Sequence, residues 1–455
     1  MVKFSVIMRN SRLARLMGGA TVGEIFGEGV LASMNWASLR NLGPGLLFAG
    51  MAIGTSHLVQ STRAGAVFGL GLAAVILAAN LAKYPAFRFG AQYAAATGET
   101  LISGYRRIGL APVLFLLAVF IFAHGFAVSA ISLVTAGMLK TVLGLELGLM
   151  PTIALVMLVV ALFLGLGRYH LLEQVNRIFM AVLTISTLVA TILVLPSIEW
   201  SIYPASAPPL DLAAFLFIVA LAGWMPSPIE ASIFSSLWTL ARKDDAEADQ
   251  NGSETTMDAT VSDFNIGYVW TTLLALCFML LGAGVMHTGG VTPEDSAPGF
   301  AAQLVALYSN ALGAWAGPIV GVAALSVMFT TAITVTDGLT RALVVTLGVL
   351  KGGADNRTAS GEGPRYRIAL VGILVAALLL LMFFMQGFRT FIDFVTSLAF
   401  LTAPVFAYLN HRAMGLDVVG EEHKPSAKLR LWSIFSITAL SAFAVAYLWL
   451  LVGRG

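Results

Sequence analysis

Runs of about 20 apolar residues recur along almost the whole chain, and they limit what it can fold into. A helix needs roughly 20 residues to cross a hydrocarbon core about 30 Å thick. About eleven such runs can be placed, centred near residues 55, 80, 124, 157, 185, 225, 275, 325, 376, 400 and 441. Of the 455 residues, 58% are hydrophobic and only 11% are charged, and the period-2 alternation of a membrane β-barrel is absent. We therefore predict an all-α polytopic membrane protein.

The basic residues indicate how the chain is oriented. Lys and Arg concentrate before the first apolar run and then in every second connection. Because cytoplasmic loops are the ones enriched in Lys and Arg, we predict a cytoplasmic N-terminus, with residues 1–43 as a tail, and a C-terminus outside. The expected location is a bacterial inner (plasma) membrane, with the lipid bilayer as partner. A net charge of +2 gives no reason to expect nucleic acid.

Two of the apolar runs contain residues that break helices. The first reads "IGTSH" at residues 53–57, and the sixth reads "GWMPSPIEAS", where Pro226 and Pro228 lack backbone donors. Backbone groups freed by such breaks cannot face lipid, so they must line a cavity or bind something. The predicted substrate site near the middle of the membrane therefore comprises Gly54, Thr55, Ser56, His57, Ala222, Met225 and Ser227.

The position of the two breaks predicts an internal repeat. Paired interrupted helices at corresponding positions of two halves are typical of secondary transporters built from inverted repeats. The sixth run is the first of a second set of five, which predicts repeats over residues 44–198 and 209–410 within a core of residues 44–410. Residues 411–455 would then form a loop and an eleventh helix. The polar stretches 241–263 and 351–367 are predicted to be loops.

Several ionisable residues lie within the apolar runs. Such groups are functional candidates by default, and we consider His124, Glu230 and Asp337 as residues that couple transport to protons. Each has a structural alternative: packing for His124, helix capping for Glu230, and pairing with Arg341 four residues on for Asp337. Lys83, near the predicted cytoplasmic end of the second run, is expected to extend its amine to the membrane surface.

Five segments resemble the natural resistance-associated macrophage protein (Nramp) family of proton-coupled divalent-metal transporters, over about residues 42–410. They are "GPGLLFAGMAIGTSHLVQSTRAGA", "GRYHLLEQVNR", "ALAGWMP", "SDFNIG" and "TTAITVTDGLTR", which are similar in order and spacing to parts of that family's helices. The resemblance implies the leucine-transporter fold and metal-ion transmembrane transport by symport.

The first break departs from the family's pattern. The family has Asp-Pro-Gly-Asn there, with metal-binding Asp and Asn, whereas this chain has Gly54 and His57 at those positions. The family's other ligands, an Ala carbonyl and a Met thioether, match Ala222 and Met225. The resemblance thus implies His57, Met225 and Ala222 as metal ligands. Without an anionic ligand, soft or borderline ions such as Mn²⁺, Fe²⁺ or Zn²⁺ are favoured over Mg²⁺ and Ca²⁺.

Two other functions stay open at this stage. Helix N-termini, the hydroxyl groups of the breaks and Arg63 could hold a small organic or anionic solute instead of a metal. The chain could also be a membrane sensor that binds without transporting. An enzyme is not expected, because the sequence has no serine-hydrolase elbow and no His-Glu-x-x-His helix, and no cofactor is expected either.

Overall fold

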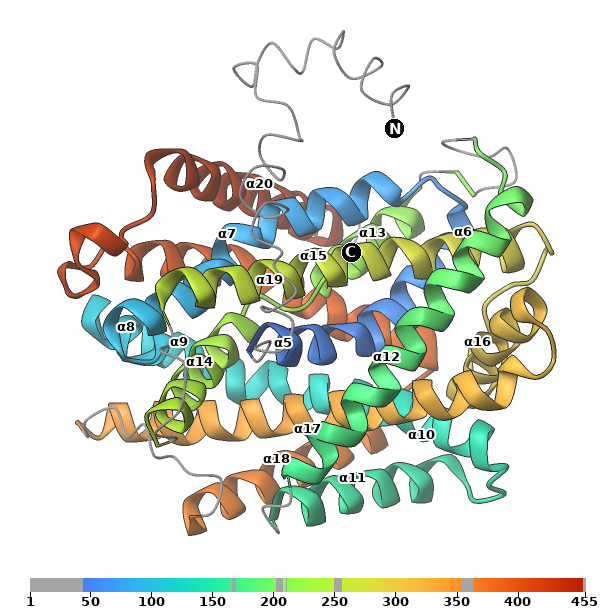
Figure 1. Ribbon diagram of the computed structural model, residues 1–455, viewed down its shortest axis with the longest axis horizontal. Coiled ribbons are helices and arrows are strands. Elements are labelled where there is room, and N and C mark those ends of the chain that lie inside the picture. The colour runs from blue at the N-terminus through green and yellow to red at the C-terminus, as the bar shows by residue number, and fades with distance from the viewer. Residues whose placement is uncertain are drawn as a thin grey trace, which may run out of the picture.

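The structure is a computed structural model that describes residues 44–165, 169–201, 208–209, 211–248, 256–352 and 363–452. Within these ranges the regular structure is entirely helical, which confirms the predicted class. The helices form one bundle, with α5 near its centre and α20 at its edge (Figure 1). The predicted cytoplasmic tail, residues 1–43, lies outside the described residues.

The first half of the bundle contains the first five predicted crossings. The first crossing combines α5 (Pro44–Ala52), the π-helical segment η2 (Ile53–Ser61) and α6 (Thr62–Phe68). The second and third crossings, with a short helix between them, are α7 (Ala73–Thr97), α8 (Leu101–Ile108), α9 (Leu110–Val119), η3 (Phe120–His124) and α10 (Gly125–Leu143). The fourth and fifth, with the 3-10 turn that follows them, are α11 (Leu149–Gly165), α12 (Tyr169–Val194) and η4 (Leu195–Ser197).

The second half contains the remaining crossings in the predicted order. The sixth is split into α13 (Leu212–Gly223) and α14 (Ala231–Ala248). The others, with one short helix between the seventh and the eighth, are α15 (Met257–Leu281) with η5 (Gly282–His287), α16 (Ala297–Leu312), α17 (Ala316–Leu350), α18 (Pro364–Phe384), α19 (Phe388–Ala413) and α20 (Ala427–Val452). Two 3-10 turns, η6 (Asp417–Val419) and η7 (Glu421–His423), precede α20. In the described part of the chain, seven helical stretches are long and apolar enough to span a membrane by themselves.

The contacts between helices follow an inverted repeat. The first half of the first crossing, α5, packs against α15 of the seventh, and α14 of the sixth crossing packs against α7 of the second. Glycines make both approaches possible. A Cβ atom on Gly45 would lie 2.1 Å from the Asp263 carbonyl oxygen, and one on Gly90 would lie 2.2 Å from the Ser232 carbonyl oxygen. Each half therefore docks its broken helix onto the second helix of the other half.

One predicted loop is largely helical. Helix α14 continues to Ala248 and α15 begins at Met257, so most of the polar stretch 241–263 belongs to helix ends. Ala, Lys and Glu are strong helix formers and can extend a helix beyond the apolar core. Thr256 then caps α15, because its side chain accepts a hydrogen bond from the Ala259 N–H. Of the other predicted loop, residues 353–362 lie outside the described part of the chain.

Candidate functional site

The first break is centred on Gly54. Its φ of −60° and ψ of −124° are not helical, so the helix axis is interrupted at the second residue of η2. A Cβ atom at this position would lie 2.6 Å from Thr331 Cγ2, on α17. Glycine is therefore needed because a neighbouring helix packs directly against the break.

The second break separates α13 from α14 over residues 224–230. Pro226 and Pro228 remove two backbone donors from this stretch. Carbonyl oxygens at and beside this break accept hydrogen bonds from a buried amine. Lys83 Nζ donates to the carbonyl oxygens of Gly223 and Ser227, at 2.7 and 3.1 Å. The prediction that Lys83 reaches the membrane surface is wrong, because the side chain is completely buried in this contact. The position of Lys83 inside an apolar run was the sequence feature that could have predicted a buried partner for its amine.

The two breaks meet. Ser56 Oγ, from the first break, donates to the Pro226 carbonyl oxygen in the second at 3.1 Å. These residues are 170 positions apart in the chain, so only the fold brings them together. Both broken helices therefore contribute backbone to one region of the interior.

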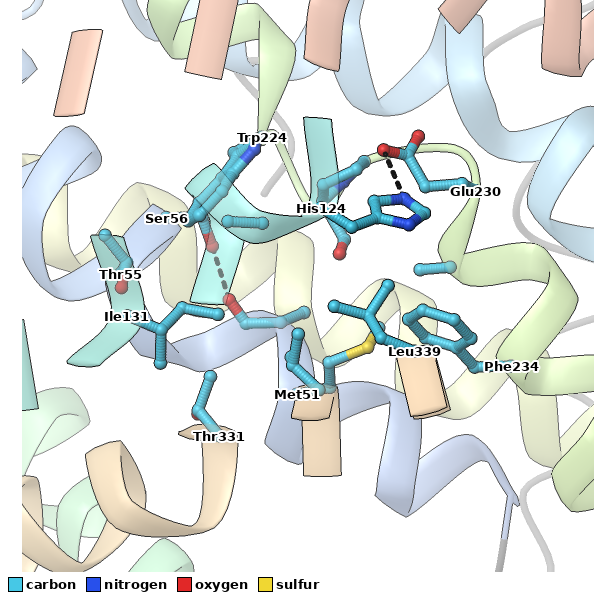
Figure 2. A pocket seen from close by; sticks show the side chains of 16 residues that line it. Met51, Thr55, Ser56, His124, Ile131, Trp224, Glu230, Phe234, Thr331 and Leu339 are labelled. Atoms are coloured by element: carbon cyan, nitrogen blue, oxygen red, sulfur yellow. Dashed lines mark hydrogen bonds and ion pairs between the residues drawn. The ribbon is translucent and has the colours of Figure 1, made fainter. Parts of the chain in front are cut away.

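A buried cavity adjoins this meeting point (Figure 2). Its walls come from α5, the two breaks, the third crossing, α14 and α17, and include Met51, Thr55, Ser56, His124, Glu230 and Thr331. The empty volume is about 480 Å³, including space that is open to solvent. The cavity suits a small, partly hydrated cargo.

The predicted substrate residues divide into two groups. Thr55, Ser56 and Ser227 line the cavity, whereas His57 does not. The His57 Nε2 atom lies 2.8 Å from the Thr271 carbonyl oxygen of α15, and Nδ1 lies 2.7 Å from Ser56 Oγ. Both ring nitrogens are thus engaged within the protein. The assignment of His57 as a metal ligand stays a prediction.

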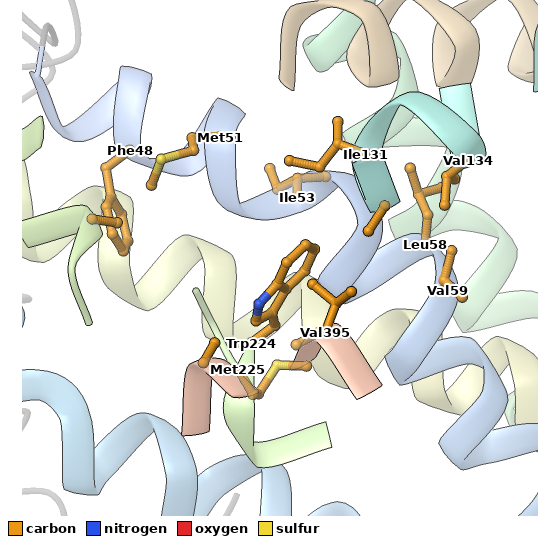
Figure 3. Close-up of a cluster of buried hydrophobic side chains, with 14 of the residues drawn as sticks. Phe48, Met51, Ile53, Leu58, Val59, Ile131, Val134, Trp224, Met225 and Val395 are labelled. Atoms are coloured by element: carbon orange, nitrogen blue, oxygen red, sulfur yellow. The ribbon is translucent and has the colours of Figure 1, made fainter. Parts of the chain in front are cut away.

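Met225 also lies away from the cavity walls. Its sulfur accepts a long hydrogen bond from Ser61, at 3.9 Å, and the side chain belongs to a buried apolar cluster with Trp224 and Val395 (Figure 3). Gly54 and Ala222 are buried at the breaks, but neither lines the cavity. The structure therefore does not gather His57, Met225 and Ala222 on the cavity wall. As metal ligands, these residues stay a prediction.

The three coupling candidates have different surroundings. His124 and Glu230 both line the cavity and face each other across 3.6 Å, measured from Nε2 to Oε1. Asp337 instead accepts hydrogen bonds from Arg341 at 2.8 Å and from the Tyr366 hydroxyl at 2.6 Å. Its carboxylate is thus neutralised on its own helix, as the structural alternative requires.

Two broken helices that face one buried cavity, in a bundle of inverted repeats, define a secondary-active membrane transporter of the leucine-transporter fold. The fold is similar to that of the Eremococcus coleocola manganese transporter, with a TM-score of 0.64 and 16% identity over 91% of this chain and 87% of that one. It is also similar to MhsT, solved in complex with L-phenylalanine, with a TM-score of 0.56 and 14% identity over 90% and 97% of the two chains.

The sequence itself shows the family. The profile of the natural resistance-associated macrophage protein-like family, Nramp, matches residues 45–450. An uncharacterized protein of Pasteurella multocida is 36% identical over 414 residues, 90% of this chain and 91% of that protein. The chain therefore belongs to the Nramp family of secondary-active metal-ion transporters. The resemblance inferred from the sequence motifs is confirmed.

Proposed function

We propose that this protein carries a borderline divalent metal ion, of the class Mn²⁺, Fe²⁺ or Zn²⁺, through the cavity between its two broken helices. The proposed setting is a bacterial plasma membrane, with the N-terminus in the cytoplasm. The observation that carries the proposal is the cavity itself, which adjoins both breaks of an Nramp chain and contains two facing ionisable side chains, His124 and Glu230. The manganese transporter of Eremococcus coleocola supports this class of cargo through its similar fold.

The electrostatics of the cavity favour a cation over an anion. The anionic alternative drew on helix N-termini, the hydroxyl groups of the breaks and Arg63. Both terminal nitrogens of Arg63 are bonded to the Asp393 carboxylate, at 2.7 and 2.9 Å. Lys83 directs its amine at two carbonyl oxygens. The ionisable groups left on the cavity wall are His124 and Glu230. A carboxylate beside an imidazole attracts a metal ion and repels an organic anion.

Transport is tested with the purified full chain in liposomes that contain a metal-quenched dye. We expect Mn²⁺, Co²⁺ or Zn²⁺ to enter in a saturable manner and faster than into protein-free liposomes. A pH-sensitive dye in parallel vesicles reports whether protons move with the metal, as the predicted symport requires. Uptake of carboxylates without metal uptake would support the organic-solute alternative, and metal binding without any uptake would support a sensor.

A further inference from the structure

The side chains of His124 and Glu230 form a buried pair on the wall of the cavity. His124 ends η3 in the third crossing, and Glu230 directly precedes α14 in the sixth. Their Nε2 and Oε1 atoms are 3.6 Å apart, and both side chains are almost fully buried. Figure 2 shows them side by side, with the imidazole and the carboxylate turned toward each other.

Three polar atoms of this pair lack hydrogen bonds. Neither ring nitrogen of His124 has a hydrogen-bond partner among the described residues, and neither does Oε2 of Glu230. Leaving a buried polar atom unsatisfied costs about 1–3 kcal/mol, and more when the group is charged. Buried polar atoms without partners are rare in native proteins, and a site that binds a ligand is one explanation for them. Because both residues line the same cavity, one ion could bind a single ring nitrogen of His124 together with Oε2 of Glu230.

Neighbouring residues pack around the pair without forming a direct ion pair with the Glu230 carboxylate in the described part of the chain. The Phe120 ring packs edge-on against the imidazole of His124, with centroids 4.5 Å apart and an interplanar angle of 71°. That contact fixes the orientation of the imidazole. The Lys83 amine lies near enough to attract the Glu230 carboxylate electrostatically, but its hydrogen bonds go to the carbonyl oxygens of Gly223 and Ser227. The Oε2 atom of Glu230, which has no hydrogen-bond partner among the described residues, therefore remains available to a cation that enters the cavity.

We propose that His124 and Glu230 are the side-chain ligands of the transported metal ion. This inference rests on the proposed function and adds the position and chemistry of the binding site. One imidazole and one carboxylate suit Mn²⁺, Fe²⁺, Co²⁺ or Zn²⁺, whereas Ca²⁺ prefers six or more oxygens and Cu⁺ prefers sulfur. Water can complete the coordination, since the cavity has room for small molecules beside the two side chains.

An incomplete protein shell fits transport. A site that moves an ion must bind it strongly enough for entry and weakly enough for release. Two side-chain ligands supplemented by water satisfy both conditions better than a closed cage of four. The ligands also come from separate crossings, the third and the sixth, so a movement of one against the other would dismantle the site.

The test is metal binding to the purified full chain in detergent, measured by isothermal titration with Co²⁺ and Zn²⁺. His124→Gln and Glu230→Gln should each weaken binding by a factor on the order of 100, because each removes one of two side-chain ligands. The visible absorption spectrum of bound Co²⁺ should change in both variants. A matched control exists in His423 and Glu422, whose side chains are 3.8 Å apart but partly or largely exposed. His423→Gln and Glu422→Gln should leave the affinity within twofold of the unsubstituted protein.

The rival ligand set is tested by His57→Gln and Met225→Leu in the same titrations. Retained binding in these two variants, together with loss in His124→Gln and Glu230→Gln, supports the proposal. Loss only in His57→Gln and Met225→Leu would overturn it in favour of the residues at the breaks. If the unsubstituted protein binds and transports metal and all four variants bind it equally, the ligand assignment fails while the proposed function stands. A protein that neither binds nor transports any of the metals would overturn both.

Discussion

Arg63 and Asp393 form a two-point ion pair that joins α6 of the first crossing to α19 of the tenth. The distances are 2.7 Å from Nη1 to Oδ1 and 2.9 Å from Nη2 to Oδ2. Gln60 strengthens the link, because its amide nitrogen donates to Asp393 and its oxygen accepts from Arg63. The Arg63 guanidinium also lies over the Phe217 ring of α13, 4.9 Å from its centroid. Three crossings are therefore tied together just beyond the first break.

Asp393→Asn should destabilise the protein by about 3 kcal/mol, because it leaves the buried Arg63 guanidinium without its counter-charge. Thermal unfolding of the purified protein in detergent measures the effect. The double variant Arg63→Leu with Asp393→Leu should recover most of the loss, since a buried ion pair can be replaced by apolar side chains at little cost. A double variant no more stable than Asp393→Asn would show that the charge itself is not what matters.

His57→Ala should lower stability by about 2–4 kcal/mol, through the lost hydrogen bonds and the space left by the ring. The Thr271 carbonyl would lose the contact that ties the first break to α15. His423→Ala, at a partly exposed position, should change stability by less than about 0.5 kcal/mol. Metal affinity measured on the folded His57→Ala protein should be unchanged, and a large drop would instead make His57 a ligand.

Gly54→Asp, which restores the acid found in the family, should destabilise this chain by about 1–3 kcal/mol. The new Cβ atom would lie 2.6 Å from Thr331 Cγ2 and 2.7 Å from Thr331 Oγ1. Adding Thr331→Ala removes both of these atoms and should recover part of the stability. Unfolding temperatures of the two single variants and the double variant measure this coupling. If the double variant loses as much as the two single variants together, Thr331 is not the obstacle.

The contacts of Asp295 near the start of α19 predict that the protein loses stability in acid. The backbone N–H of Arg389 donates to its carboxylate, and this hydrogen bond holds the pKa of Asp295 below its ordinary value. A carboxyl whose pKa is lower in the folded state adds stability above its unfolded pKa, about 3.9, and loses it as the pH falls through the folded pKa. Asp295→Asn should therefore be less stable than the unsubstituted protein at pH 6. The two unfolding temperatures should converge once the pH falls below the folded-state pKa of Asp295. A difference that does not depend on pH would show that the charge of Asp295 contributes nothing.

The sequence by itself determined the crossings, their order and the place of the two breaks. Hydropathy decides whether a segment of about 20 residues enters the membrane, and this depends on the segment alone. Gly54, Pro226 and Pro228 likewise act on their own backbone, so the interruptions can be read locally. The end of α14 was misjudged because helix formers such as Ala, Lys and Glu also occur in polar loops.

Only the tertiary structure decided which side chains reach the cavity. His57 lies at a break, yet its ring bonds Thr271, 214 residues away, while His124 and Glu230 come from separate crossings to face the cavity. Lys83 finds its carbonyl partners 140 and 144 residues further along the chain. Hydropathy and helix breaking act within one segment. The partner of a buried polar group is set by how two distant helices pack, which no single segment contains.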